Sequence, residues 1–231
     1  MSKVIVIGGG PSGMMAALTA SKNGHEVTLV ERNEELGKKL KLTGGGRCNV
    51  TNNRYIDEFF DKVVTNKKFL YSAFYSFTNE DLLNFLTESN LEYKVEEDND
   101  YKVYTKSDKA TELIHTFKEL LLNNNIKIMY NSKVVDLIIN ENNKIEGVVL
   151  ENVLGDKVII STGGHSHSKT GSDGSMHKIL KKHGHTIARP YPALSPLKIK
   201  EDWTRRLQGI SFKKVELSCK IKKKKISKIG D

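Results

Sequence analysis

The sequence predicts an α/β fold that begins with a strand, a glycine-rich turn, a helix and a second strand. Residues 3–7 are mostly β-branched and form a short run suited to a buried parallel strand. Residues 14–20 contain several small residues, as closely packed helices do, and Asn23 with Gly24 is a typical helix end. Residues 25–30 form the second strand, and Glu31 ends it. Together these elements predict a Rossmann-like βαβ unit, which holds a dinucleotide.

The turn before the helix has the spacing G-x-G-x-x-G at Gly8, Gly10 and Gly13. Gly8 permits a tight turn, Gly10 lets the main chain approach phosphates, and Gly13 lets the helix pack close to the strand. The free N–H groups and the dipole at the helix start attract an anion, and Glu31 is placed to accept hydrogen bonds from a ribose diol. The predicted nucleotide site therefore consists of Gly8, Gly10, Pro11, Ser12, Gly13, Met14, Glu31 and Arg32.

Length and composition indicate a globular protein from a reducing compartment. With 38% hydrophobic and 28% charged residues, a chain of 231 residues buries a substantial core. Its two cysteines, Cys48 and Cys219, lie far apart and make no disulfide framework. The N-terminal apolar run is too short for a signal peptide, and no stretch approaches membrane-spanning length. We therefore expect a soluble, cytoplasmic protein without a membrane partner.

The formal net charge of +9 raises the question of a nucleic-acid partner. The segment 220–228 holds six lysines in nine residues, but no aromatic residues are interleaved with them. Apolar and basic residues alternate around Ile221 and Ile226, which favours an exposed edge strand or hairpin over a nucleic-acid site. The excess charge also attracts an anionic cofactor from a distance.

Four further strands are expected, at residues 126–130, 133–139, 145–150 and 158–160. The last strand runs into Ser161-Thr162-Gly163-Gly164, at a carboxyl end where open α/β sheets bind ligands. Thr78 with Asp81 predicts a capping box for one helix, and Ser107 or Asp108 is expected to cap a second helix over residues 110–121. A third helix is expected over residues 173–183.

A proline cluster at Pro190, Pro192 and Pro196 predicts a rigid crossing between two domains. We expect a dinucleotide-binding domain over residues 1–192 and a basic, β-rich domain over residues 193–231.

The glycine turn, Glu31 and the later segment Thr43-Gly44-Gly45-Gly46-Arg47-Cys48-Asn49-Val50-Thr51-Asn52 together resemble a bacterial family of FAD-dependent oxidoreductases. This family includes aminoacetone oxidase and a bile-acid 3-dehydro reductase. Residues 161–164 with 170–174 are similar to its second flavin-contacting segment, and residues 191–197 to its domain junction. The resemblance covers nearly the whole chain.

The resemblance implies a glutathione-reductase-type FAD domain into which a β-rich domain is inserted. Family members continue beyond a point equivalent to residue 231, so this chain is expected to be the N-terminal portion, with the inserted domain incomplete. The resemblance also implies that the loop after Glu31 wraps the ribityl chain and pyrophosphate. Its expected contacts are Lys39, Thr43, Gly44, Gly45, Arg47, Cys48 and Asn49, followed by Thr162, Gly163 and Gly164.

Several residues carry two interpretations. Arg47 and Lys39 offer cations to phosphate, whereas Gly44 and Gly45 would alternatively make a flexible surface loop. Val134 is expected to offer main-chain hydrogen bonds to adenine while its side chain is an ordinary buried valine. Asp173 either approaches the flavin or, with Ser172, caps a helix.

Two other residue types suggest chemistry that we do not favour. Cys48 has no C-x-x-C partner, so a structural or flavin-neighbouring thiol is favoured over a redox disulfide. The histidines between residues 165 and 185 have no zinc-ligand spacing, so we expect no metal site.

The sequence therefore predicts an FAD-dependent oxidoreductase that acts on an unidentified small molecule, with NAD(P)H as a candidate electron donor. No catalytic residue is assigned, because in flavoenzymes the cofactor transfers the hydride or electrons. The alternatives are a noncatalytic nucleotide-binding fragment, an NAD(P)-binding protein without flavin and, last, a nucleic-acid binder. Oligomeric state is left open.

Overall fold

The computed structural model describes residues 1–150, 153–191, 198–210, 212, 214–222 and 224–230. The chain divides into two compact units, Met1–Ala188 and Arg189–Asp231. The predicted domain boundary between residues 192 and 193 lies outside the described residues, as do Pro192, Pro196 and most of the expected domain junction.

The first unit is built on a four-stranded parallel sheet. Its strands are β1 (Lys3–Ile7), β2 (Glu26–Val30), β6 (Lys127–Met129) and β10 (Lys157–Ile160), in the order β10-β1-β2-β6. The chain thus builds outward from β1 through β2 and β6 and then returns to the other side of β1. Such a reversal of strand order opens a crevice at the carboxyl ends of the strands. This arrangement confirms the predicted α/β Rossmann-type fold.

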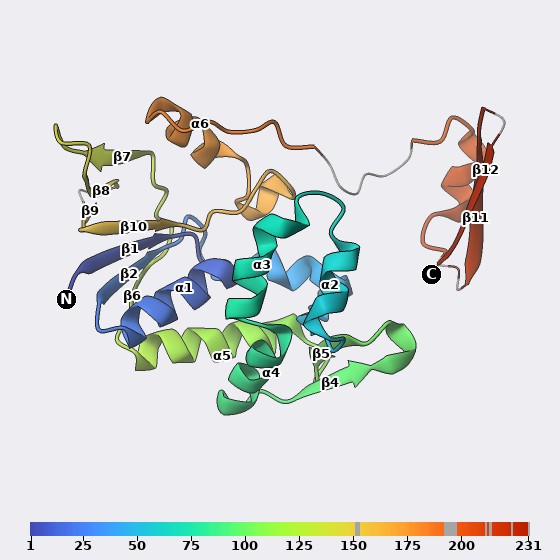
Figure 1. Ribbon diagram of the computed structural model, residues 1–231, viewed down its shortest axis with the longest axis horizontal. Helices are drawn as coiled ribbons and strands as arrows, with labels where there is room; N and C mark the ends of the chain where they lie inside the picture. The colour runs from blue at the N-terminus through green and yellow to red at the C-terminus, as the bar shows by residue number, and fades with distance from the viewer. Residues whose placement is uncertain (151–152, 192–197, 211, 213, 223, 231) are drawn as a thin grey trace. The chain divides into compact units, whose positions relative to one another are not determined.

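Both faces of this sheet are covered, which explains why β1 is apolar along most of its length. Val4 and Val6 pack into one cluster with α1 (Pro11–Lys22) and α5 (Ala110–Asn123). Ile5 and Ile7 pack into a second cluster, on the side of β7 (Asp136–Ile139), β8 (Ile145–Val149), β9 (Val153–Leu154) and α6 (Ser175–Lys182). Figure 1 shows α1 and α5 on one side of the sheet and α6 on the other.

The segment between β2 and α5 forms a subdomain of short elements. They are η1 (Leu40–Gly46), β3 (Thr51–Asn52), α2 (Ile56–Lys62), α3 (Lys67–Ser76), α4 (Asn79–Glu88), β4 (Tyr93–Glu96), η2 (Glu97–Asn99) and β5 (Lys102–Thr105). The predicted capping box is confirmed, because Asp81 N donates to Thr78 Oγ1 at 3.1 Å while Thr78 N donates to Asp81 Oδ2 at 2.7 Å. The strands β3, β5 and β4 pair antiparallel, so the region between Glu92 and Tyr104 is a hairpin.

The expected cap of α5 at Ser107 or Asp108 is wrong. The N-cap position is Lys109, which makes no side-chain capping bond. Asp108 has φ +58°, and its carboxylate accepts hydrogen bonds from Arg47 and Lys94 instead. Because the Asp108 carboxylate is hydrogen-bonded to these two cations, it does not accept from the amides of the first turn of α5.

The strand expected over residues 133–139 begins only at Asp136. Val134 lies in the connection before β7, although its side chain is buried as expected.

The C-terminal end of α6 is tied to β7 through Asp136. The carboxylate accepts hydrogen bonds from His183 Nε2 at 2.8 Å and from Lys182 Nζ. The Lys182 ammonium and then His183 hold the pKa of Asp136 well below its usual range. Because the carboxyl pKa is lower in the folded state than in the unfolded chain, this stabilisation is present above the unfolded pKa and lost as pH falls through the folded pKa.

We therefore expect Asp136→Asn to lower the free energy of unfolding by about 1 kcal/mol at pH 7, the upper range for a partly exposed ion pair. The difference from the unmodified chain should shrink as pH is lowered below about 4, the ordinary carboxyl pKa. Urea denaturation at several pH values measures both effects. Asp98→Asn, at an exposed carboxylate of η2, is the matched control. A difference of the same size at all pH values would contradict the assignment.

The second unit contains η4 (Asp202–Leu207) and an antiparallel hairpin of β11 (Val215–Ile221) and β12 (Lys224–Gly230). The hairpin predicted for the lysine-rich segment is therefore confirmed. Lys220 and Lys225 are directly opposed across the two strands, and both are exposed. Residues 189–231 contain thirteen Lys and Arg against four Asp and Glu, so this unit carries all of the +9 net charge.

No helix in the described parts of the chain has the length and apolar character needed to cross a bilayer.

Candidate functional site

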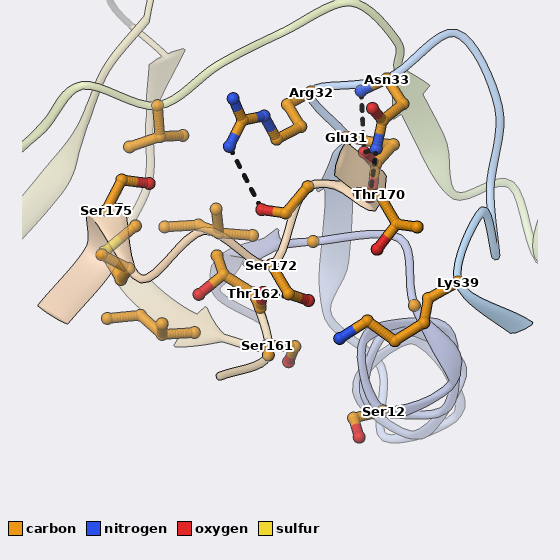
Figure 2. A pocket seen from close by; sticks show the side chains of 18 of the residues that line it. Ser12, Glu31, Arg32, Asn33, Lys39, Ser161, Thr162, Thr170, Ser172 and Ser175 are labelled. Carbon is orange, nitrogen blue, oxygen red and sulfur yellow. Dashed lines mark hydrogen bonds between the residues drawn. The ribbon is translucent and has the colours of Figure 1, made fainter. Parts of the chain in front are cut away.

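A cavity of about 650 Å³ opens where β1, β2 and β10 end, and the last residue of each strand, Ile7, Val30 and Ile160, lines it. Its walls come from segments far apart in sequence, as Figure 2 shows. Ten of the expected cofactor residues line it: Gly8, Gly10, Pro11, Ser12, Glu31, Arg32, Lys39, Val134, Thr162 and Gly163. The cavity lies where the strand order reverses, as expected for a ligand site in an open α/β sheet.

The glycine turn is tightly packed at Gly13 but open to the cavity at Gly10. A Cβ at Gly13 would lie 1.8 Å from the main-chain oxygen of Gly8, so the first turn of α1 packs directly on the turn. A Cβ at Gly10 would meet no atom within 4 Å, and Gly10 lines the cavity. The absence of a side chain at Gly13 serves packing, whereas the absence of one at Gly10 keeps the cavity open.

The N-terminal end of α1 faces this cavity without a side-chain cap. Its N-cap residue is Gly10, and Pro11, which has no N–H group, occupies the first helical position. The amides of a first helical turn have no partner within the helix, and the helix dipole gives this end a partial positive charge. The uncapped end of α1 can therefore bind an anion.

Lys39 brings a cation to the same cavity. Its ammonium donates to Ser166 Oγ at 3.3 Å, and burial lowers its pKa. A Cβ at Gly163 would lie 4.0 Å from Lys39 Nζ, so the ammonium approaches the loop that follows β10. No carboxylate within the described ranges forms an ion pair with Lys39. An anion bound in the cavity would compensate this charge.

Glu31, at the end of β2, is buried and holds the walls of the cavity together. Its Oε2 accepts from Gly9 N at 2.6 Å. Its Oε1 accepts from Asn33 N at 2.8 Å and from Asn33 Nδ2 at 2.7 Å. Among the described residues no cation pairs with this carboxylate, so these three N–H groups stabilise its charge.

Arg32 bridges from the end of β2 to the segment before α6. Its Nη1 donates to Gly171 O at 3.2 Å and to Asp173 Oδ2 at 2.7 Å. The Arg32 guanidinium, and after it Ser175, hold the pKa of Asp173 well below its usual range. Asp173 Oδ1 also accepts from Ser175 N at 3.0 Å in the first turn of α6, although the N-cap position is Gly174. The expected helix cap at Ser172 and Asp173 is wrong, because no side chain caps α6. Asp173, which lies outside the cavity lining, instead joins Arg32 to the first residue of α6.

The remaining expected residues also lie outside the cavity lining. Gly13 and Met14 are buried behind the turn, and Gly164 follows the lining residue Gly163. The other six come from the glycine-rich loop at and after η1, and they are Thr43, Gly44, Gly45, Arg47, Cys48 and Asn49. Cys48 is buried, its thiol is free, and burial raises its pKa.

Arg47 is held by the β4–β5 hairpin and by the residues that follow it. Its guanidinium hydrogen-bonds Asp108 Oδ1 at 2.7 Å and the carboxylate of Glu96, and lies 3.9 Å from the ring centre of Tyr104. These contacts raise its pKa above the ordinary arginine value. With both carboxylates engaged, Arg47 ties the glycine-rich loop to the subdomain.

We therefore expect Arg47→Ala to loosen this loop, because Gly44 and Gly45 have positive φ angles and glycine loses the most conformational freedom when a loop is ordered. Amide hydrogen exchange in residues 40–49 should speed up by about tenfold or more. Arg54→Ala is the control, because Arg54 makes a similar pair of ion pairs with Glu58 and Asp100 but does not contact this loop. Unchanged exchange in residues 40–49 would show that Arg47 does not anchor them.

Sequence reasoning missed several lining residues, chiefly Asn33, Ser132, Lys133, Met176, Leu180 and Ile187. Asn33 lies two residues after Glu31, and its proximity to the strand end was the available signal. Met176 and Leu180 are one helical turn apart in α6, and both pack on the side of the sheet that carries Ile5 and Ile7. This helical spacing of apolar residues was the available signal in the sequence.

A model of a known protein family, described as the HI0933-like protein Rossmann domain, matches residues 2–229. A 3-dehydro-bile acid delta(4,6)-reductase of Clostridium scindens is 28% identical over 212 residues, which cover 91% of this chain and 51% of the reductase. A ribosomal RNA dihydrouridine synthase of Haemophilus influenzae is 26% identical, over 91% of this chain and 53% of the synthase. The chain thus spans about half the length of the curated relatives it matches.

Among solved structures, the open conformation of a flavocytochrome c3 fumarate reductase is similar in fold. The TM-score is 0.63 at 18% sequence identity, and the match covers 80% of this chain and 41% of that protein.

Proposed function

The chain belongs to the HI0933-like Rossmann-domain family, and we propose that it is the FAD-binding portion of an oxidoreductase that acts on a small molecule. FAD is the cofactor that the family and its flavoenzyme relatives support. The observation that carries the proposal is the meeting of an uncapped helix end, the open side of Gly10 and the Lys39 ammonium in one cavity.

The residues present fit FAD. The first-turn amides of α1 and the Lys39 ammonium would hold the pyrophosphate, since both attract anions. Glu31 would accept a hydrogen bond from the adenosine ribose, and the main chain at Val134 would contact the adenine. When bound, the flavin supplies hydride or electron transfer, while these residues bind and orient it.

Calorimetric titration of the purified chain with FAD and with NADH tests this proposal. We expect FAD to bind more tightly than NADH and the complex to show flavin absorbance. NADH binding without flavin affinity would instead support a nicotinamide-binding protein. If the flavin complex accepts electrons from NAD(P)H, the candidate donor, its absorbance should bleach. A complex that stays oxidised would favour a noncatalytic fragment.

The basic second unit supports a second candidate substrate, a base within RNA. All of the net charge lies in residues 189–231, and one relative is named a ribosomal RNA dihydrouridine synthase. Directly opposed lysines such as Lys220 and Lys225 repel one another, and a polyanion would relieve this repulsion. RNA binding that weakens steeply with salt, and that Lys220→Gln/Lys225→Gln reduces, would favour this substrate over a small molecule.

We also propose a cytoplasmic location, since Cys48 and Cys219 are both free thiols. Cell fractionation that places the protein outside the cytoplasm would contradict it.

A further inference from the structure

Asn33 joins two walls of the cavity through a single amide group. One N–H of Nδ2 donates to Glu31 Oε1 at 2.7 Å, and the other donates to the main-chain oxygen of Thr170 at 3.1 Å. Figure 2 shows Glu31 and Asn33 beside Thr170. Thr170 belongs to η3 (Ser168–Thr170), so Asn33 connects the end of β2 to a segment 137 residues later.

The contact between these walls is close. Gly171 has φ +110°, and a Cβ there would lie 3.0 Å from Asn33 Nδ2 and 3.2 Å from Arg32 Cδ. The segment 168–174 therefore lies directly against the end of β2, where Asn33 holds it on one side and Arg32 on the other.

The hydrogen bonds of Asn33 leave the Glu31 carboxylate with little spare capacity. A carboxylate offers about four acceptor positions. At Glu31 the main-chain and side-chain N–H groups of Asn33 take two of them on Oε1, and Gly9 N takes one on Oε2. The position that is left is on Oε2, so the orientation of the carboxylate decides whether it faces a ligand.

We infer that Asn33 is a positioning residue, which orients the Glu31 carboxylate so that Oε2 accepts a hydroxyl of the adenosine ribose. The inference rests on the proposed function, because it requires that the cavity bind FAD. Asn33 acts through Glu31 and through the segment 168–174. Without the side-chain amide, Asn33 N and Gly9 N still hold one carboxylate oxygen each, but the third bond and the link to Thr170 are lost. Recognition of the ribose hydroxyls should therefore weaken.

The test compares FAD with an analogue whose adenosine ribose lacks both hydroxyls, the 2′,3′-dideoxyadenosine form. Calorimetric titration gives the dissociation constant of each ligand for the unmodified chain, for Asn33→Ser and for Asn142→Ser. Asn142 lies in the exposed turn between β7 and β8 and serves as the matched control. We expect the unmodified chain and the control to bind FAD about tenfold more tightly than the analogue. In Asn33→Ser this ratio should fall to about threefold or less, because only the two main-chain N–H groups still orient the carboxylate.

A residue with a merely structural role would weaken both ligands by the same factor and leave the ratio unchanged, and this result would overturn the inference. An unmodified chain that binds both ligands equally would overturn it too, while the proposed function would stand. No FAD binding at all by the unmodified chain would reject the proposed function itself. If Asn33→Ser does not fold, Asn33→Asp, which keeps the shape of the side chain, takes its place. If neither folds, Asn33 is a residue of the fold, and the inference is rejected.

Discussion

Replacing Gly10 by valine is expected to weaken FAD binding by about a hundredfold or more, while the fold of residues 1–188 stays intact. Gly10 has φ −79° and ψ 178°, an extended conformation that valine adopts readily. A Cβ at this position meets no protein atom within 4 Å, so the added methyl groups would extend into the cavity. They would occupy the space in front of the first-turn amides of α1. Losing two charge-assisted hydrogen bonds to the pyrophosphate weakens binding by about a hundredfold or more.

Two comparisons make the Gly10 experiment specific. Gly10→Ala should give a smaller loss of affinity, since its single methyl group fills less of the space. Gly13→Ala should instead lower the free energy of unfolding, because its Cβ would lie 1.8 Å from the Gly8 carbonyl oxygen. Urea denaturation and FAD titration together separate these effects. Full FAD affinity in a folded Gly10→Val variant would mean that the pyrophosphate does not lie at this turn.

Replacing Glu31 by alanine is expected to lower both stability and FAD affinity. Glu31 is buried, and its carboxylate accepts from the main-chain N–H groups of Gly9 and Asn33. The variant leaves the buried Gly9 N–H and the partly buried Asn33 N–H without their acceptor, at a cost of about 1–3 kcal/mol for a buried donor and less for a partly buried one. We expect the free energy of unfolding to fall by about 3 kcal/mol in urea denaturation, and FAD affinity to fall by at least tenfold.

Glu26→Ala is the matched control. Glu26 is the first residue of β2, the strand that ends directly before Glu31, and its side chain is exposed. Its unfolding free energy should change by less than about 0.5 kcal/mol. If the Glu31 and Glu26 variants were equally stable, the carboxylate of Glu31 would not hold the turn.

The βαβ unit was predictable because its signals are local. The apolar run of β1, the glycine spacing and the acid after β2 all fall within 31 residues, and each reflects a steric or electrostatic need of the turn. The same local pattern placed Glu31 at the cavity. It did not reveal that Gly9 and Asn33 occupy most of its acceptor positions, since side-chain orientation depends on the folded turn.

The contacts that close the cavity were beyond sequence reasoning because they join distant segments. The Arg47 guanidinium was expected to offer a cation to phosphate, and its side chain instead hydrogen-bonds residues 49 and 61 positions later. The pairing of β3 with β5, and of β5 with β4, brings Glu96 near Arg47. The start of α5 was misassigned for the same reason, because Asp108 takes part in this network.

A crystal structure of the chain grown with excess FAD tests the central claim most directly. The account predicts the pyrophosphate at the Gly8–Ser12 turn, within hydrogen-bonding distance of the first-turn amides of α1, and the adenosine ribose at Glu31. A well-ordered FAD bound elsewhere on the chain, with side chains filling the cavity beside Gly10, would contradict it.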